Sequence, residues 1–370
     1  MNSQPAPKPL AFAPQVKVTT AYESFWRFAA ERQEIFFRRV RGKPHPWTND
    51  PVLAKYKFTN AYRASDRVSQ YLIRNVIYRD DLPGSPNEVL FRILLFKFFN
   101  KIDTWKALER ELGPLVFENY RFAGYDAVLT TARQAGRSIY SAAYIMPPGN
   151  RFFGRRAKHR NHLLLLERMV ADQLGERLTE TRSMRHGFEM LHSYPTIGNF
   201  LAYQLITDIN YSELTDFDEM DFVMPGPGAS DGLRKCFADP DSLSESDLIR
   251  LVAARQEQEF ERYGIHFQEL WGRRLHLIDC QNLFCEIGKY ARVAHPHIAG
   301  TTGRVRIKQR FVPSSKPIKL FFPPKWKLND KINGATLQPA SVSFSWGETH
   351  GLQQLPTERP AHRPSSRRQG

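Results

Sequence analysis

The chain has 370 residues, of which 41% are hydrophobic and 12% aromatic, and this composition excludes a globally disordered protein. Its net charge of +15 favours a polyanionic partner, above all nucleic acid, and residues 301–370 alone hold 13 Lys and Arg against 3 Asp and Glu. No apolar run reaches the roughly 18 residues that cross a bilayer, and the three cysteines form no CxxC pair. We therefore expect a protein of the cytoplasm or nucleus that has no membrane partner.

In chain order, the sequence predicts a disordered leader at residues 1–20, a helical domain at residues 21–305 and a basic tail at residues 306–370. The leader is rich in proline, and the tail is rich in Pro, Ser and basic residues. Within the tail, residues 318–322 and 342–346 are apolar enough to dock locally. Strand-like alternation is confined to residues 304–312. The predicted fold class is all-α.

Apolar side chains recur with helical spacing through most of the middle domain. Helices are expected at residues 21–41, 51–67, 87–111, 124–144, 162–174, 179–191, 198–209, 245–263 and 275–293.

One candidate site is the glycine-bearing turn at residues 193–198, which opens directly into an apolar helix. Unpaired N–H groups at a helix N-terminus favour an anion, so Thr196, Gly198 and Asn199 are predicted to seat a DNA phosphate. The turn resembles the hairpin of helix-hairpin-helix DNA glycosylases, although any helix can begin after a glycine. In that pattern a catalytic aspartate follows about twenty residues later. Of the acids in this stretch, Asp221 is the preferred candidate for the catalytic aspartate, provided that its carboxylate is shielded from water. The alternative is that Asp221 is an acid of a solvated loop with no catalytic role.

The other candidate site lies in the first 67 residues, where arginines are interleaved with aromatic and amide side chains. Arginines suit phosphate clamping, and aromatic rings suit stacking on an extruded base. An internal Arg–Asp network is the alternative. The residues assigned to this site are Arg32, Arg39, Arg63, Arg67, Trp47, Asp50 and Asn60.

Other signatures are missing from the sequence. His295, His297, Cys280 and Cys285 lack metal-finger spacing, and there is no HExxH and no P-loop motif. We expect no metal and no cofactor.

Several segments in succession resemble one family, the α-glutamyl/putrescinyl thymine pyrophosphorylase group, also described as the helical domain found with 5-hydroxymethyluracil DNA kinases. The resemblance covers roughly residues 22–305, and the order of the segments makes it specific. They are residues 25–32, 39–50, 56–67, 96–105, 142–146, 226–229 and 279–290, together with the hairpin.

The resemblance implies a glycosylase-like helical fold that acts on a flipped, modified thymine in double-stranded DNA. The implied reaction replaces phosphate or pyrophosphate on the 5-methylene carbon by an amine, either an amino acid or a polyamine. Asp221 or Glu286 is then the base, Lys289 and Gln281 orient the thymine, and Tyr290 completes the substrate site. Because the sequence lacks a P-loop, a separate DNA-base kinase is expected.

Two other functions stay open. One is a monofunctional DNA glycosylase, because Asn199 stands near the position where a lyase would need a lysine. The other is a DNA-binding module without catalysis. Convergence of Arg32, Arg63, Asp221 and Glu286 on one place would favour an enzyme.

Overall fold

The computed structural model describes residues 16–239, 243–314 and 318–334, and over these residues it consists of helices with no β-strand. The all-α prediction is confirmed. Backbone pairing between segments is limited in this part of the chain to three isolated bridges. No described helix is both long and apolar enough to cross a bilayer.

The helices differ widely in length, and the longest are the first and the fifteenth. They are α1 (Thr20–Val40), α2 (Pro51–Lys55), α3 (Arg67–Leu72), α4 (Pro86–Phe99), α5 (Ile102–Leu112), α6 (Phe122–Gln134), α7 (Asn150–Phe153), α8 (Lys158–Ala171), α9 (Leu174–Thr179), α10 (Met184–His192), α11 (Asn199–Ile209), α12 (Pro227–Cys236), α13 (Glu245–Ala254), α14 (Gln256–Arg262), α15 (Leu277–Ala294) and α16 (Asn329–Gly334).

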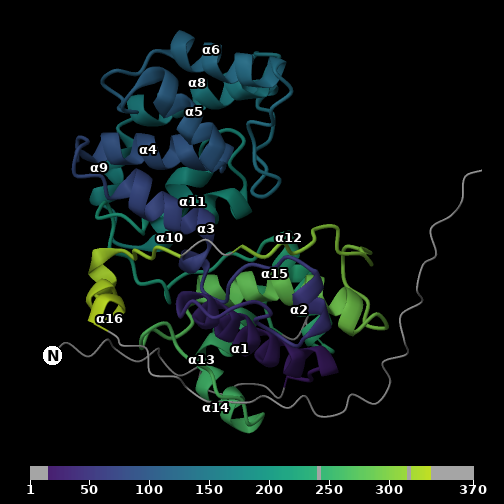
Figure 1. The fold of residues 1–370 in the computed structure, drawn as a ribbon. Helices are drawn as coiled ribbons and strands as arrows, with labels where there is room; N and C mark the ends of the chain where they lie inside the picture. Colours follow the sequence, from purple (N-terminus) through teal and green to yellow (C-terminus); the bar gives the residue numbers. More distant parts are fainter. Residues whose placement is uncertain (1–15, 240–242, 315–317, 335–370) are drawn as a thin grey trace, which may run out of the picture. The chain divides into compact units, whose positions relative to one another are not determined.

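Helix α15 lies at the centre of one group of helices and packs against α1, α12 and α13 (Figure 1). The apolar face of α1 meets α15 through Phe25, whose ring stacks on Phe284 with 4.5 Å between the centroids. Both rings are fully buried. The side chain of Thr19 caps α1 by accepting the N–H of Ala21, so the first turn of this helix has a partner for one of its free donors.

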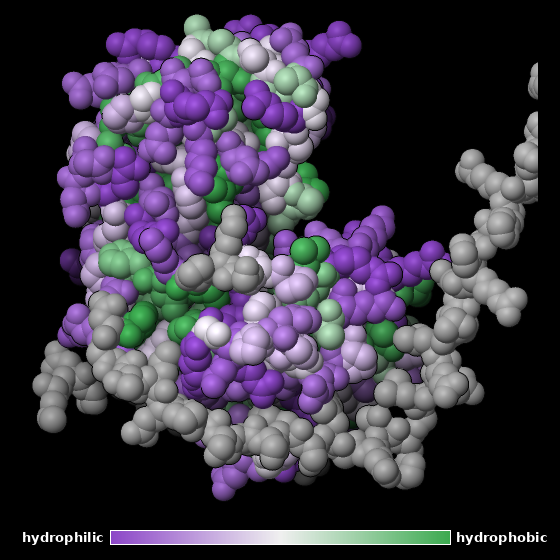
Figure 2. Space-filling model, viewed as in Figure 1, coloured by the Kyte–Doolittle hydropathy of each residue, from purple (hydrophilic) through white to green (hydrophobic). Residues whose placement is uncertain are grey.

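A second group is built around α4, which packs against α8, α9 and α11, while α5 packs against α6. Helix α4 is apolar on nearly every side and is correspondingly buried from Leu90 to Phe99. Figure 2 shows that hydrophilic residues cover most of the outer surface of α5, α6 and α8 in this view. The apolar side chains of this group are thus buried between its helices.

Helices α12 and α15 approach so closely that their crossing depends on glycine. A side chain at Gly232 would overlap the carbonyl oxygen of Phe284, and Gly288 faces Gly232 from α15. We expect Gly232→Ala to lower the free energy of unfolding by about 1–3 kcal/mol, because the backbones must separate to admit a methyl group. Gly84→Ala, at an exposed position with open space around it, is the control. Urea denaturation measures both, and equal stabilities would contradict this account.

The helix boundaries depart from the predicted ones where single residues change the backbone direction. Asn100 adopts a left-handed conformation, with φ of 48°, and divides the expected helix 87–111 into α4 and α5. Helix α6 ends at Gln134, shortly before Gly136, rather than continuing to residue 144. The segment predicted as one helix over residues 51–67 contains only α2, a loop and a short 3₁₀ turn. Helix α12 was not predicted at all.

The described chain also continues past residue 305, where the helical domain was expected to end. Phe322 and Leu328 are buried, and the main-chain N–H of Phe321 donates to the side chain of Gln70. Docking of residues 318–322 is therefore observed, whereas residues 342–346 lie outside the described residues. The strand-like segment 304–312 forms a single bridge, between Tyr56 and Arg310. Of the expected leader, residues 1–15 lie outside the description.

Candidate functional site

The loop at residues 58–60 joins the first helix to the last large one. From α1, the Arg32 guanidinium donates to the carbonyl oxygen of Thr59 at 2.8 Å and to Oδ1 of Asn60 at 2.9 Å. From α15, Glu286 accepts the N–H of Thr59 at 3.0 Å. Arg32, Asn60 and Glu286 are all buried. The early arginine and the late glutamate therefore both hold the same short loop.

Two further residues of α15 complete this contact. Asn282 donates to the hydroxyl of Thr59 at 2.9 Å. Lys289 pairs with Glu286 at 2.8 Å, and its ammonium lies 4.6 Å from the centre of the Phe58 ring. Its side chain remains 20% exposed, so this cation is accessible from solvent. We call Arg32, Thr59, Asn60, Asp66, Asn282, Glu286 and Lys289 the Arg32–Glu286 cluster.

Asp66 connects this cluster to a second set of charges. Its Oδ1 accepts the N–H of Asn60 at 2.9 Å. The pKa of its carboxyl group is also influenced by the charges of Arg32, Glu286 and Arg63. Burial raises the pKa of Asp66 to about 7, and the Asn60 hydrogen bond and the Arg32 charge offset this only in part. The residue is partly exposed at the surface. Asp66 is thus a partly exposed residue whose carboxyl pKa is raised by burial to about 7.

The second set is a buried ion-pair network. Arg63 makes a bidentate contact to Asp208, with distances of 2.8 and 2.9 Å, and also donates to Gln204 and Tyr211. Lys97 reaches the same carboxylate at 3.1 Å. Burial alone would raise the pKa of Asp208, but the charges of Arg63 and Lys97 outweigh it and hold this pKa below its ordinary value. We call Arg63, Lys97, Gln204, Asp208 and Tyr211 the Arg63–Asp208 network.

Tyr144 covers this network and leads to the hairpin. Its ring lies 4.6 Å from the Lys97 ammonium and stacks nearly parallel on Phe200, at the start of α11. The backbone of Tyr144 is left-handed, with φ of 55°, an unfavourable conformation for an aromatic residue that these contacts must maintain. Tyr144 is partly exposed. The segment 142–146 and the hairpin therefore meet beside Arg63.

The hairpin itself has the predicted form. Helix α10 ends at His192, a tight turn follows, and α11 begins at Asn199 with Gly198 as its N-cap. Thr196 has a left-handed backbone, and its hydroxyl is buried without a hydrogen-bond partner among the described residues. Gly198 and Asn199 are exposed. Free N–H groups at this helix start are consequently open to solvent.

The glycine-proline turn before α12 packs between the hairpin and α15. A side chain at Gly226 would overlap the ring of Phe200, and one at Gly228 would overlap the sulfur of Cys285. Cys285 immediately precedes Glu286 in α15. Segments separated by more than two hundred residues in the sequence thus gather around Asp66, Tyr144 and Glu286.

These gathered segments lie within the part of the chain that matches a known family model. The model of the 5-hmdU DNA kinase, helical domain, matches residues 19–300. The chain belongs to the 5-hmdU DNA kinase helical domain family. A protein named 5-hmdU DNA kinase, from Bacillus phage SP10, is 28% identical over 287 residues, which are 73% of this chain and 45% of that protein. The chain thus spans less than half the length of this relative. No solved structure matches the chain.

In this helical domain the four predicted phosphate-binding arginines have different surroundings. Arg63 is 2% exposed, and its guanidinium is paired with Asp208. For Arg63, the alternative of an internal Arg–Asp network is therefore what the structure shows. The guanidinium of Arg32 is hydrogen-bonded to the loop at residues 58–60. Arg39 is half-buried and lies 5.2 Å from the centre of the Trp47 ring. Arg67 is exposed, and within the described residues it forms no ion pair. A phosphate therefore has freest access to Arg67.

Other predicted substrate-binding residues hold the domain together. Asp50 caps α2 through the N–H groups of Val52 and Leu53 and also accepts the hydroxyl of Tyr290 at 2.7 Å. Trp47 is buried, and its indole N–H donates to the carbonyl of Lys43. Gln281 is buried on α15. These contacts place Trp47, Asp50 and Tyr290 beside α1 and α15 in structural roles.

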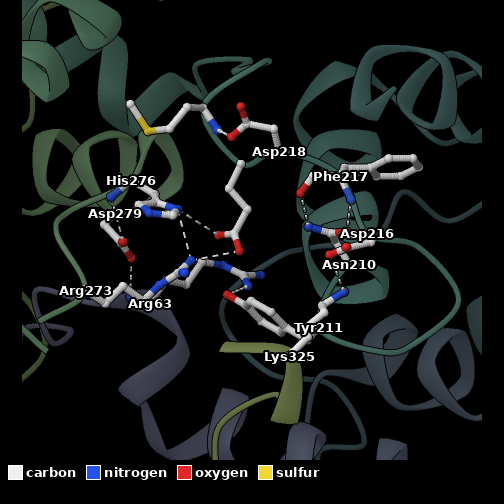
Figure 3. A network of polar contacts seen from close by, with 12 residues as sticks. Arg63, Asn210, Tyr211, Asp216, Phe217, Asp218, Arg273, His276, Asp279 and Lys325 are labelled. Carbon is white, nitrogen blue, oxygen red and sulfur yellow. Dashed lines mark hydrogen bonds and ion pairs between the residues drawn. The ribbon is translucent and has the colours of Figure 1, made fainter. Parts of the chain in front are cut away.

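The acidic stretch after the hairpin differs from the expectation. Asp221 is exposed on a turn, so the shielding that its predicted role requires is absent. The buried carboxylate of this stretch is Glu219, which the sequence analysis did not single out. It pairs with Arg273 at 2.8 Å and approaches His276, both of which are labelled in Figure 3. Burial alone would raise the pKa of Glu219, but Arg273 and His276 lower it to about 2.

Arg273 also supports the docked segment after residue 317. Its guanidinium lies 3.6 Å from the centre of the Trp326 ring, and Lys325 donates to the carbonyl oxygens of Ser212 and Thr215. The buried Glu219 therefore holds Arg273 beside the docked residues 318–334, which is a structural contact. An acidic position buried by a distant arginine carries no local sequence signal.

A cavity of about 300 Å³ lies elsewhere, between α5 and α6, and shares no residue with the Arg32–Glu286 cluster. Apolar side chains such as Val128 and Leu129 line it, together with Lys101 and Thr104. Among the described residues, no group of three His, Cys, Asp or Glu side chains is arranged to hold a metal ion.

Proposed function

We propose that this chain acts on DNA carrying 5-hydroxymethyluracil that has been phosphorylated, and replaces the phosphate or pyrophosphate by an amine. The family match over residues 19–300 and the name of the phage relative support a substrate of this kind. The bound base is flipped out of the duplex in this proposal, because its 5-methylene carbon must reach groups that are partly buried.

The observation that carries the proposal is the position of Asp66. The carboxyl group of this partly exposed residue has a pKa of about 7 and is influenced by the charges of Arg32 and Arg63, and the exposed Arg67 follows it in the chain. A base that titrates near the working pH is suited to accept a proton from an amine, and a free guanidinium is suited to bind a departing phosphate. Besides Arg67, the solvent-accessible ammonium of Lys289, which pairs with Glu286, is a second cation that could bind the departing phosphate.

In the proposed step, the amine nitrogen attacks the 5-methylene carbon of the base and forms a C–N bond. The C–O bond to the phosphate or pyrophosphate breaks, and the leaving group departs with the bonding electrons. The proton released by the amine passes to the carboxylate of Asp66. Arg67 and Lys289 stabilise the charge that accumulates on the departing oxygens. Asp66 thereby takes the role that was first assigned to Asp221 or Glu286.

The proposal needs two other participants. The amine donor is an amino acid or a polyamine. Because the sequence contains no P-loop, the phosphate on the base is added by a separate kinase activity.

Mass spectrometry of nucleosides tests the proposal. Duplexes that contain 5-hydroxymethyluracil, its phosphate or its pyrophosphate are incubated with the protein and with candidate amines. We expect an amine adduct from the phosphorylated duplexes only, at a yield that depends on the amine. Release of the free base would instead establish a glycosylase, and binding without any new nucleoside would establish a DNA-binding module. Either result would overturn the proposed reaction.

Lys289→Met gives a second expected result, because methionine keeps the length of the side chain but not its charge. If Lys289 stabilises the leaving group, the single-turnover rate falls by roughly 10²-fold, as when one electrostatic donor is removed from an active site. Lys331→Met, at an exposed lysine of α16, is the matched control. An unchanged rate in Lys289→Met with the phosphorylated duplex would remove this residue from the site.

A further inference from the structure

The segment at residues 137–160 concentrates positive charge in the part of the chain up to residue 300. It contains six Lys and Arg and no Asp or Glu, whereas the remaining residues up to 300 carry a net charge of −1. Much of the segment is a loop between α6 and α8 that includes the short helix α7. Up to residue 300, the excess of positive charge therefore lies in this segment and not in the Arg-rich segments on which the sequence analysis relied.

We infer that residues 145–156 form the surface through which this chain holds duplex DNA beside the modified base. The inference rests on the proposed function and names the part of the molecule that meets the duplex. Its arginines bind backbone phosphates, and its exposed apolar side chains enter the duplex next to the base that leaves the stack.

Three arginines in this stretch are available to a ligand. Arg151, Arg155 and Arg156 are exposed, and no ion pair within the described residues involves any of them. Arg160, by contrast, is already paired with Asp126 at 2.8 Å. Unpaired guanidinium groups on one short segment suit the repeated negative charges of a DNA backbone.

The same stretch exposes two large apolar side chains. Ile145 is 69% exposed and Phe152 is 60% exposed, and they are two of only five such side chains among the described residues. Apolar side chains that are exposed within a basic surface are suited to contact with a DNA duplex. Proteins that unstack a duplex insert side chains of this kind between base steps, while cations hold the phosphates on both sides.

Two glycines and several hydrogen bonds define the shape of this loop. Helix α7 is flanked by Gly149 and Gly154, both of which have left-handed backbones. The buried Asn161 donates to the carbonyl oxygens of Pro148 and Arg155 and accepts the N–H of Arg155. His162 is within 2.7 Å of the carbonyl oxygen of Pro147. A fixed loop loses little conformational entropy on binding, so its exposed side chains are preorganised.

This surface adjoins both the hairpin and the candidate site. A side chain at Gly149 would contact the methyl group of Thr196 in the hairpin turn. Ile145 directly follows Tyr144, which stacks on Phe200 and covers Lys97 of the Arg63–Asp208 network. A duplex held by the loop would therefore lie next to the exposed start of α11 and to the residues around Asp66.

The first test measures the affinity of the full chain for an unmodified duplex at several salt concentrations. The triple variant Arg151→Gln, Arg155→Gln, Arg156→Gln is expected to bind more weakly and to flatten the plot of log Kd against log salt by about three, one for each phosphate contact. Arg110, Arg168 and Arg177 are exposed arginines with acidic neighbours, and their triple Gln variant is the control. Equal slopes in both triple variants would overturn the inference.

The second test asks whether the apolar side chains enter the duplex. A 2-aminopurine placed beside 5-hydroxymethyluracil becomes more fluorescent when its stacking is lost. We expect wild-type protein to raise this fluorescence, and Ile145→Ala and Phe152→Ala to reduce the rise at saturating protein. Val312→Ala, which alters a side chain that is 78% exposed elsewhere, should behave as wild type. A full rise in both loop variants would contradict the assignment.

Neither measurement requires turnover. A protein that binds DNA through this loop but forms no amine adduct would disprove the proposed reaction and leave the surface in place. If the loop variants formed the adduct as well as the wild type and bound DNA as tightly, the proposed reaction would stand and the proposed surface would be wrong. Unchanged thermal unfolding midpoints in the variants establish that the fold is intact.

Discussion

Replacing Asp208 with alanine is expected to destabilise the protein by about 3–5 kcal/mol, which is the cost of leaving buried charges without their partner. Asp208 is completely buried and faces two cations, Arg63 at 2.8 Å and Lys97 at 3.1 Å. Both would remain in an environment with little water. The bidentate contact also links the loop before α3 to α11, so its loss separates two parts of the core.

Urea denaturation followed by circular dichroism measures this effect. Asp208→Asn keeps the shape of the side chain but removes its charge. If the alanine variant does not fold, the stability of Asp208→Asn is compared with that of the wild type instead. Asp216→Ala removes a carboxylate that is 92% exposed and 3.9 Å from Lys325, and we expect a change within about 0.5 kcal/mol. A loss of less than about 1 kcal/mol in Asp208→Ala would show that the network contributes little to stability.

Replacing Asp66 with asparagine is expected to lower the rate of amine transfer by roughly 10²- to 10⁴-fold, the usual contribution of a general base. DNA affinity should change little, because Asp66 is not one of the residues assigned to hold the duplex. Asp221→Asn is the matched control, since the same change is made at an exposed acid. A normal rate in Asp66→Asn, or an equal loss in both variants, would contradict the assignment.

The pH dependence follows from the raised pKa of this group. Only the deprotonated carboxylate accepts a proton, so the rate in wild type should rise with pH through about 7 and then level off. The residual rate of Asp66→Asn should lack this rise. Single-turnover rates between pH 5.5 and 8.5 test both statements.

The same pKa shift affects stability. The folded state retains the Asp66 proton up to about pH 7, whereas the unfolded chain releases it near the ordinary value of 3.8. The contribution of this group to stability is therefore present below about pH 4 and is lost as the pH rises toward 7. Asp66→Asn removes that part of the pH dependence, which denaturation at several pH values detects.

The candidate site was only partly predictable, as its arginines illustrate. Arginines with aromatic neighbours indicated phosphate binding, yet Arg63 is neutralised by Asp208, which lies 145 residues later in the chain. Asp66 lies within the same Arg-rich segment but was assigned no role, because its burial depends on contacts from α1 and α15. Glu219 escaped notice for the same reason. Its partner Arg273 is 54 residues away.

The amino-acid sequence alone determined the helical class, the position of the hairpin before α11, the excess of positive charge and the resemblance to the family. These properties depend on spacing over one or two helical turns, on composition, or on the order of motifs, and all of them are local or additive. Only the tertiary structure decided which charged side chains are neutralised inside the protein and which remain free for a ligand. That choice depends on burial and on partners far away in the chain, because a charge buried without a partner is too costly to persist.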